Sequence, residues 1–198
     1  MAHPLFLAST SRYRAALLER LGLPFTVEAP GVDEAARTAE VPPARALRLA
    51  HAKATAVANR HPGAWVIGSD QVAVCGERIL DKPGNAARCR EQLAASSGRR
   101  VEFHTAAVLH SVEPRSVAEH VDLTTVHFRT LTSQEIARYV ELDRPFDCAG
   151  GFRSEGLGIA LFESIDTRDP AALVGLPLIW LAGALRSAGL DPFARAQD

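Results

Sequence analysis

Apolar positions along the chain form two patterns: short continuous runs, which predict buried strands, and longer Ala- and Leu-rich stretches, which predict helices. Strands are predicted at residues 5–8, 25–28, 65–75, 78–80, 101–109, 117–128 and 158–162. Helices are predicted at residues 12–21, 43–59, 86–95, 132–142 and 177–188. The alternation of the two element types is typical of an α/β fold.

Capping and turn residues mark the ends of several of these elements. Pro43 stands at the first turn of its helix, and Thr132 with Glu135 forms a capping-box pattern. A polar turn containing Pro114 separates the two longest strands, which are therefore expected to pair in antiparallel fashion. The predicted fold class is α/β, with a mixed, twisted sheet flanked by helices.

Composition narrows the range of functions. The chain has 198 residues, 47% of them hydrophobic and 23% charged, which suits one domain or two small lobes and excludes general disorder. A net charge of −1 and only 6% aromatic residues argue against a nucleic-acid partner. No apolar run is long enough to span a bilayer, so no membrane partner is expected. Residues 1–7 lack the features of a signal peptide, and we expect a cytoplasmic location.

The cysteines are Cys75, Cys89 and Cys148, and no two of them form a C-x-x-C pair. This spacing argues against a disulfide framework and against a zinc cluster. We therefore expect small, buried apolar residues.

Lysine is rare in this chain. Of 22 basic residues, only Lys53 and Lys82 are lysines, and the other 20 are arginines. Lysine carries a compact point charge and arginine a planar fork, so a phosphate pocket shaped for one need not accept the other. The alternative is that both are ordinary surface residues.

Several motifs of common enzyme classes are absent from the sequence, namely G-x-x-x-x-G-K-[ST], G-x-G-x-x-G, H-E-x-x-H and G-x-S-x-G. A different feature remains at the junction of the first strand and helix, where Ser9, Thr10 and Ser11 precede Arg12 and Arg14. Backbone N–H groups at a helix start attract anions, so a triphosphate is a natural ligand. The alternative is a helix cap followed by surface arginines.

Asp70 follows an apolar strand, where α/β sheets often bind ligands. A carboxylate there can bind Mg²⁺ or take a proton from water, although an exposed aspartate in a turn is also common. Lys82 lies twelve residues further on, after a hairpin-like return that would bring it back beside Asp70. Asp33 and Glu34, in a long loop, offer a second carboxylate for a metal.

Together these segments resemble the Maf family of nucleoside triphosphate pyrophosphatases. The resemblance covers residues 5 to 190, and both lysines fall inside its motifs. The matching segments, in chain order, are A-S-T-S-R-Y-R from Ala8, V-D-E from Val32, A-K-A from Ala52, G-S-D-Q-V from Gly68, K-P from Lys82, C-A-G-G-F from Cys148, S-E-G-L-G-I from Ser154 and D-P-x-x-L-x-G-L-P-L from Asp169.

The resemblance implies a single Maf-like domain over residues 1–198, similar to inosine triphosphatase, with two lobes and a central cleft. The implied reaction hydrolyses a nucleoside triphosphate to the monophosphate and diphosphate. Asp70 is expected to accept the proton and to share a divalent metal, Mg²⁺, with Glu34. The residues expected to hold the phosphates are Ser9, Arg14, Lys53 and Lys82.

Within the family, S-D-Q-V resembles the branch that hydrolyses 7-methyl-GTP, and the branch for dTTP and UTP usually has a D-T-V-type sequence there. The positions tied to substrate choice match Tyr13, Gln71 and Glu155. The chain departs from the family pattern with Asp81 where Gly is common. It also has Gly151 and Arg153 where Ser and Lys are frequent.

Two other functions stay open at this stage. A regulatory nucleotide-binding protein with little turnover is one, because the family is also linked to control of cell division. A dTTP/UTP pyrophosphatase of the same family is the other. An intact Asp70 and both lysines favour an enzyme. The resemblance is compatible with a homodimer.

Overall fold

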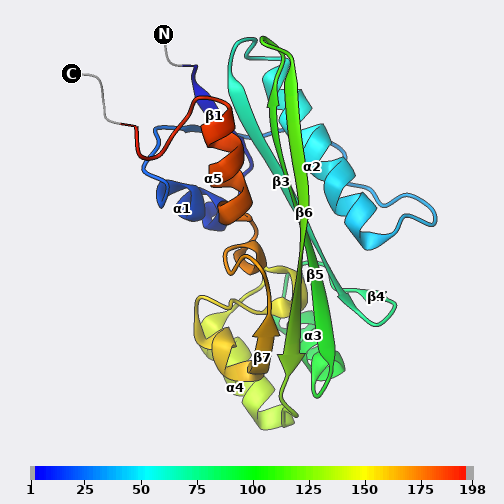
Figure 1. The fold of residues 1–198 in the computed structure, drawn as a ribbon. Coiled ribbons are helices and arrows are strands. Elements are labelled where there is room, and N and C mark those ends of the chain that lie inside the picture. Colours follow the sequence, from blue (N-terminus) through cyan, green and yellow to red (C-terminus); the bar gives the residue numbers. More distant parts are fainter. Residues whose placement is uncertain (1–2, 195–198) are drawn as a thin grey trace. The chain divides into compact units, whose positions relative to one another are not determined.

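The computed structural model describes residues 3–194, so the two ends of the predicted 1–198 domain lie outside the described residues. The strands are β1 Leu5–Ala8, β2 Thr26–Glu28, β3 Trp65–Cys75, β4 Arg78–Ile79, β5 Arg100–Ser111, β6 Ser116–Phe128 and β7 Phe162–Asp166 (Figure 1). The α-helices are α1 Arg12–Glu19, α2 Pro42–Ala58, α3 Ala86–Ser96, α4 Ser133–Asp143 and α5 Leu178–Ser187. Three short 3₁₀ helices are η1 Ala149–Gly151, η2 Leu157–Leu161 and η3 Ala172–Val174.

Within residues 3–194 the strands form one seven-stranded sheet in the order β2-β1-β3-β5-β6-β7, with β4 paired to β3. β1 is parallel to β2 and to β3, whereas β4 and β7 are antiparallel to their neighbours. At one end of the β5–β6 hairpin the Phe128 N–H donates to the Arg99 carbonyl, and at the other His110 bonds the Ser116 carbonyl. The two longest strands are therefore antiparallel, and the predicted mixed sheet is confirmed.

The chain divides into two compact units. Unit 1 comprises residues 1–70, 105–122 and 169–198, and unit 2 comprises residues 71–104 and 123–168. Strands β3, β5 and β6 each contribute one part to each unit. In the part of the chain that the structure describes, no helix is both long and apolar enough to cross a bilayer.

The core of unit 1 forms where α1 and α5 cover β1 and the first part of β3 (Figure 1). Trp65 and Ile67 of β3 belong to this core, together with Leu18 of α1 and Leu181 of α5. Successive side chains of a strand point to opposite faces. The even-numbered positions of β3, beginning at Val66, therefore face the other side, which α2 covers.

Four aromatic rings build the core of unit 2. Phe152 packs edge-to-face against Phe103, Phe128 and Phe162, with ring centroids 4.8 to 5.6 Å apart. Helix α3 packs on α4 and on η1 in the same unit. Phe152 lies in the segment between η1 and η2, so the aromatic cluster anchors that segment.

The predicted strand at residues 158–162 is wrong. Residues Leu157–Leu161 form η2, and the strand begins only at Phe162. A short apolar run does not distinguish a strand from a helical turn by its periodicity. Here Leu157 and Ile159 are about half exposed, so this run is not the buried strand that its composition predicts.

The three cysteines are free thiols. Cys75 and Cys89 are buried, as predicted, and Cys148 is half-buried. Burial raises the pKa of the Cys89 thiol to about 11, which keeps it protonated and unreactive at neutral pH.

Candidate active site

Asp70 lies inside β3 and not after it, because the strand continues to Cys75. The parallel partner β1 is shorter, and its last residue, Ala8, pairs with Gly68. Asp70 therefore lies two residues past the end of β1, beside the junction that leads into α1. The predicted strand at residues 65–75 is confirmed, and Asp70 lies next to a strand end because the neighbouring strand β1 is shorter.

Helix α2 approaches β3 closely at Gly68. A Cβ atom at this position would lie 2.2 Å from the Ala50 carbonyl oxygen and 2.7 Å from the Ala54 nitrogen. Only glycine fits at such a distance, so helix and strand are in backbone contact. Lys53 lies between Ala50 and Ala54 in sequence, on the buried face of the same helix.

Lys53 bridges two carboxylates. Its Nζ atom lies 2.6 Å from Asp70 Oδ1 and 2.8 Å from Glu34 Oε1. The Lys53 and Asp70 side chains are only 6% and 11% exposed, whereas Glu34 is 57% exposed. A buried ammonium needs such partners, because an unpaired buried charge is strongly unfavourable. The structure thus brings Asp70, Glu34 and Lys53 together, and their roles toward substrate and metal stay predictions.

The loop that carries Glu34 is tied to α2 by Arg48. The Arg48 guanidinium donates to both carboxylate oxygens of Glu40, at 2.5 and 2.7 Å, and to the Ala35 carbonyl at 3.2 Å. The hydrogen bonds from Arg48 lower the pKa of Glu40 to about 2. A spacing of eight residues between a loop and a helix carries no local signal, so this pair is not evident in the sequence.

The cap of helix α1 is Ser11, whose Oγ accepts from the Arg14 N–H. Ser9 is buried, and its Oγ accepts from the Ser11 N–H at 3.0 Å. The two serines thus order the turn between β1 and α1 in succession. Thr10, the third hydroxyl of this group, is exposed.

Arg14 is fixed by a carbonyl. Its Nε donates to the Gly175 oxygen at 2.9 Å, and the Ser69 hydroxyl donates to the same oxygen at 2.9 Å. Burial lowers the pKa of Arg14, and the carboxylates of Asp70 and Glu34 act in the opposite direction. Arg14 therefore lies within the field of the two carboxylates that Lys53 bridges. Ser69 and Gly175 were present in the quoted motifs, but only the structure gives them this role.

Lys82 belongs to unit 2 and is exposed. The predicted hairpin return is confirmed as far as Leu80, whose N–H donates to the Ala73 carbonyl at 2.8 Å. The following loop is held at two points: Gln92 Nε2 donates to the Asp81 carbonyl at 2.8 Å, and the Gly84 N–H donates to the Phe146 carbonyl at 2.9 Å. The expected proximity of Lys82 to Asp70 stays a prediction.

The three residues expected to select the base are divided between the units. Tyr13, in α1 of unit 1, is half-buried, and the Arg12 guanidinium carbon lies 4.8 Å from its ring centroid. Gln71 is the one residue of the eleven in β3 that is not buried. Glu155 is exposed, between η1 and η2 of unit 2. Their common role stays a prediction.

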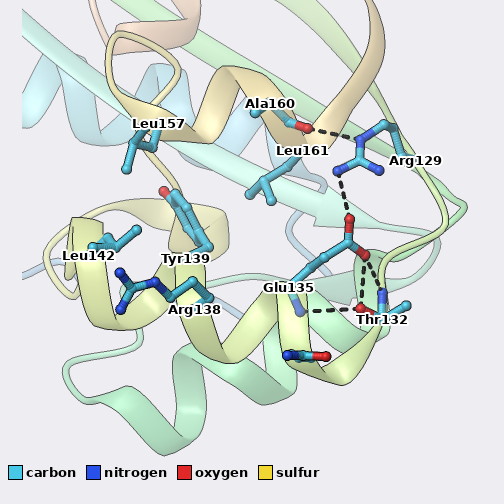
Figure 2. Close-up of a pocket in the computed structure, with 10 residues that line it drawn as sticks. Arg129, Thr132, Glu135, Arg138, Tyr139, Leu142, Leu157, Ala160 and Leu161 are labelled. Carbon is cyan, nitrogen blue, oxygen red and sulfur yellow. Dashed lines mark hydrogen bonds and ion pairs between the residues drawn. The ribbon is translucent and has the colours of Figure 1, made fainter.

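A cavity of about 420 Å³ lies in unit 2 between α4 and η2 (Figure 2). Leu142, Leu157 and Leu161 form its apolar part, and Arg129 and Glu135 are paired with each other at its edge. None of the predicted site residues lines this cavity. It is therefore not the predicted triphosphate site.

Among the described residues, no group of three or more His, Cys, Asp or Glu side chains has the arrangement of a metal site. Two carboxylates, those of Asp70 and Glu34, nevertheless share one cation, the Lys53 ammonium. Mg²⁺ bound with a polyphosphate typically takes only one or two protein carboxylates, and its other ligands are phosphate and water oxygens. The donor set fits that kind of ion and not a closed, all-protein cage.

A sequence model described as "Maf-like protein" matches residues 4–188. The chain belongs to this family. The motif-based resemblance is thereby confirmed, and Asp70, Lys53 and Glu34 form their cluster within the Maf-like region.

This Maf-like chain is similar over nearly its whole length to curated proteins named "7-methyl-GTP pyrophosphatase". One from Xanthomonas oryzae pv. oryzae (strain MAFF 311018) is 55% identical, covering 93% of this chain and 96% of the relative. One from Bordetella avium (strain 197N) is 50% identical over 95% and 94% of the two chains. One from Idiomarina loihiensis is 47% identical over 97% and 98%.

Among solved structures, the Ham1 protein of Staphylococcus aureus is similar to this Maf-like chain, with a TM-score of 0.46 and 15% sequence identity. The match covers 64% of this chain and 72% of that one.

Proposed function

We propose that this chain hydrolyses 7-methyl-GTP to 7-methyl-GMP and diphosphate, as a hydrolase acting on acid anhydrides. The observation that carries the proposal is the near-complete coverage by relatives of that name at 47 to 55% identity. The buried Lys53–Asp70 pair supplies a physical basis for the chemistry.

Asp70 is the proposed proton acceptor. A carboxylate oxygen in this position can take a proton from the water that attacks the substrate phosphorus. Lys53, at 2.6 Å, orients the carboxylate through the ion pair. The other Asp70 oxygen, Oδ2, is the proposed site of proton transfer, because Oδ1 accepts the hydrogen bond from Lys53.

The phosphates are proposed to bind around Arg14, Lys53 and Ser9, with Lys82 as a further cation. Lysine has three N–H donors, and two of those on Lys53 are directed at the carboxylates of Asp70 and Glu34. The third is proposed to donate to a phosphate oxygen. Arg14, with Nε fixed on the Gly175 carbonyl, has its terminal nitrogens to offer to the same anion.

Asp70 and Glu34 are the proposed ligands of a divalent metal, with Mg²⁺ as the preferred ion because both donors are hard oxygens. When bound, the ion neutralises charge that develops on the phosphate oxygens during hydrolysis. Glu34 is well suited to adjust to such an ion, because its side chain is mostly exposed while its loop is tethered through Arg48.

The methylated base is proposed to contact Tyr13, Gln71 and Glu155. 7-Methylguanine is cationic, and an aromatic face attracts a planar cation. The planar Arg12 guanidinium already lies over the Tyr13 ring, which supports the ability of this ring to bind a planar cation. A carboxylate such as that of Glu155 can accept hydrogen bonds from the N1–H and the amino group of guanine.

The decisive experiment measures diphosphate release from 7-methyl-GTP, GTP, UTP and dTTP with the purified protein and Mg²⁺. We expect the highest kcat/KM for 7-methyl-GTP. A preference for UTP and dTTP would instead indicate a dTTP/UTP pyrophosphatase of the same family. Binding of these nucleotides without diphosphate release would instead support a regulatory protein. The cytoplasmic location and a homodimer stay predictions.

A further inference from the structure

Asp143, the last residue of α4, is buried and holds the segment that carries Glu155. Its carboxylate accepts hydrogen bonds from the Nε and one terminal nitrogen of Arg153, with the Nε contact at 3.2 Å. The same terminal nitrogen also donates to the Asp143 backbone carbonyl at 2.9 Å. A helix end leaves such carbonyls without partners, so the Arg153 fork binds both the side chain and the end of the helix.

Tyr139, one turn earlier in α4, closes this arrangement into a ring. Its hydroxyl donates to Asp143 Oδ2 at 2.8 Å and accepts from the Arg153 backbone N–H at 3.1 Å. Figure 2 shows the Tyr139 side chain directed toward Leu157 of η2, just beyond Glu155 in the chain. We refer to Tyr139, Asp143 and Arg153 as the loop clamp.

The ionisation of the loop clamp agrees with this geometry. Burial raises the pKa of the Tyr139 hydroxyl, and the hydrogen bond to Asp143 acts in the same direction. Burial also acts to raise the pKa of Asp143, but hydrogen bonds from Arg153 and Tyr139 outweigh it and lower the pKa. At neutral pH the tyrosine is therefore a donor and the aspartate a charged acceptor.

Asp143 also lies close to the chain on the far side of Glu155. A Cβ atom on Gly156 would lie 3.1 Å from Asp143 Oδ1, closer than most side chains tolerate. The Gly156 N–H donates in turn to the Arg153 carbonyl at 3.2 Å. Arg153, two residues before Glu155, and Gly156, directly after it, thus both lie against one buried carboxylate. The Glu155 side chain itself remains exposed.

We propose that Asp143, acting through Arg153 and Tyr139, is a positioning residue that fixes Glu155 for recognition of the methylated base. The inference rests on the proposed function, in which Glu155 selects 7-methyl-GTP. It also gives a role to Arg153, one of the departures noted in the sequence. A lysine there could pair with Asp143, but its single nitrogen could not reproduce the two nitrogens on the carboxylate, one of which also reaches the helix end.

The test compares Tyr139→Phe, Asp143→Asn and Arg153→Lys with the wild type. The matched control is Glu141→Gln, which removes a carboxylate from the exposed Arg138–Glu141 pair of the same helix. The readouts are kcat and KM for 7-methyl-GTP and for UTP, thermal unfolding, and hydrogen exchange of the amides of residues 153–158. Tyr139→Phe is the mildest change and guards against an unfolded Asp143→Asn variant.

We expect Tyr139→Phe to lower kcat/KM for 7-methyl-GTP by roughly fivefold or more, mainly through KM, and to speed exchange at residues 153–158. Activity on UTP, whose base lacks the N1–H and amino pair of guanine, should change less than twofold. The double variant Tyr139→Phe/Glu155→Gln should have the same kcat/KM for 7-methyl-GTP as Glu155→Gln alone, because both changes act on the same interaction between Glu155 and the base.

The outcomes separate the two proposals. Additive losses in the double variant, or equal losses on both substrates, would overturn the positioning role while the wild-type preference for 7-methyl-GTP stands. A wild type without that preference would overturn the proposed function and the positioning role with it. Exchange in Glu141→Gln equal to that in Tyr139→Phe would also overturn the loop clamp.

Discussion

Ser69 and Asp70 are adjacent in β3, yet they bind partners on opposite faces of the strand. The Ser69 hydroxyl donates to the Gly175 carbonyl at 2.9 Å, and Asp70 Oδ1 accepts from Lys53 Nζ at 2.6 Å. The alternation of side chains along a strand produces this division. One short stretch of backbone therefore fixes both the carbonyl that holds Arg14 and the proposed proton acceptor.

Replacing Asp70 by Asn keeps the side-chain shape and removes the charge that binds a metal and accepts a proton. We expect turnover of 7-methyl-GTP to fall by about 10²–10⁴-fold, measured as diphosphate release. Circular dichroism should show a folded protein. Glu77→Gln, in the exposed turn after the same strand, is the control and should keep wild-type turnover. Near-normal turnover in Asp70→Asn would exclude Asp70 as the proton acceptor.

Lys82→Arg tests whether the exposed lysine of the 80–85 loop serves the phosphates. If Lys82 binds them as a point charge, Lys82→Arg should lose nearly as much kcat/KM as Lys82→Ala. Arg78→Lys, an equally exposed basic residue on β4, should have no effect. Full activity in Lys82→Arg would instead mean that this lysine is an ordinary surface residue.

Glu155→Gln removes the charge that the base-recognition proposal requires. We expect kcat/KM for 7-methyl-GTP to fall by about 10-fold or more, with a much smaller change for UTP and dTTP. Glu163→Gln, another exposed glutamate in unit 2, serves as the control. An equal loss on all nucleotides would contradict a role of Glu155 in substrate choice.

Asp169 stabilises the start of α5 from ten residues away. Its buried carboxylate accepts from the Ala171 N–H at 3.0 Å and from the Ile179 N–H at 2.6 Å. In Asp169→Asn one of these N–H groups faces an amide nitrogen, at a cost of about 1–3 kcal/mol. For a chain of this size we expect a fall in Tm of roughly 3–10 °C by calorimetry. The exposed Asp166→Asn should leave Tm within about 2 °C.

Glu40 predicts a pH dependence of stability. Its pKa is lowered in the folded protein to about 2, so its pairing with Arg48 contributes stability that is fully present above the ordinary glutamate value. That contribution is lost as the pH falls toward 2. The difference in Tm between wild type and Glu40→Gln should therefore narrow below about pH 4.5. A constant difference from pH 7 to pH 2 would contradict the pairing.

The sequence predicted elements best where local chemistry determines them. The capping box of Thr132 and Glu135 is present with both of its hydrogen bonds, at the start of α4. The two-residue turn between β3 and β4 also lies between the predicted strands at residues 65–75 and 78–80, because Cys75 pairs with Arg78. The run at residues 157–161 has no such signal, and its apolar composition alone led to the wrong element.

The candidate site was predictable in its residue types but not in its contacts. The resemblance of the motifs singles out Asp70, Lys53 and Glu34. In the structure the Lys53 ammonium contacts both carboxylates. The partners that hold the site in place were not evident, because Arg48 and the Gly175 carbonyl act across long sequence separations. Such contacts depend on how helices and loops pack, which no local pattern records.

The backbone contact at Gly68 has a consequence for how the site responds to a ligand. Because α2 lies directly on β3 there, the backbone separation between Lys53 and Asp70 is set by two packed elements. The charges are thus preorganised before a nucleotide arrives, and little conformational entropy is lost on binding. A larger residue at position 68 would shift the helix and misplace the ammonium. Gly68, which bears no charge, therefore controls how closely Lys53 approaches Asp70.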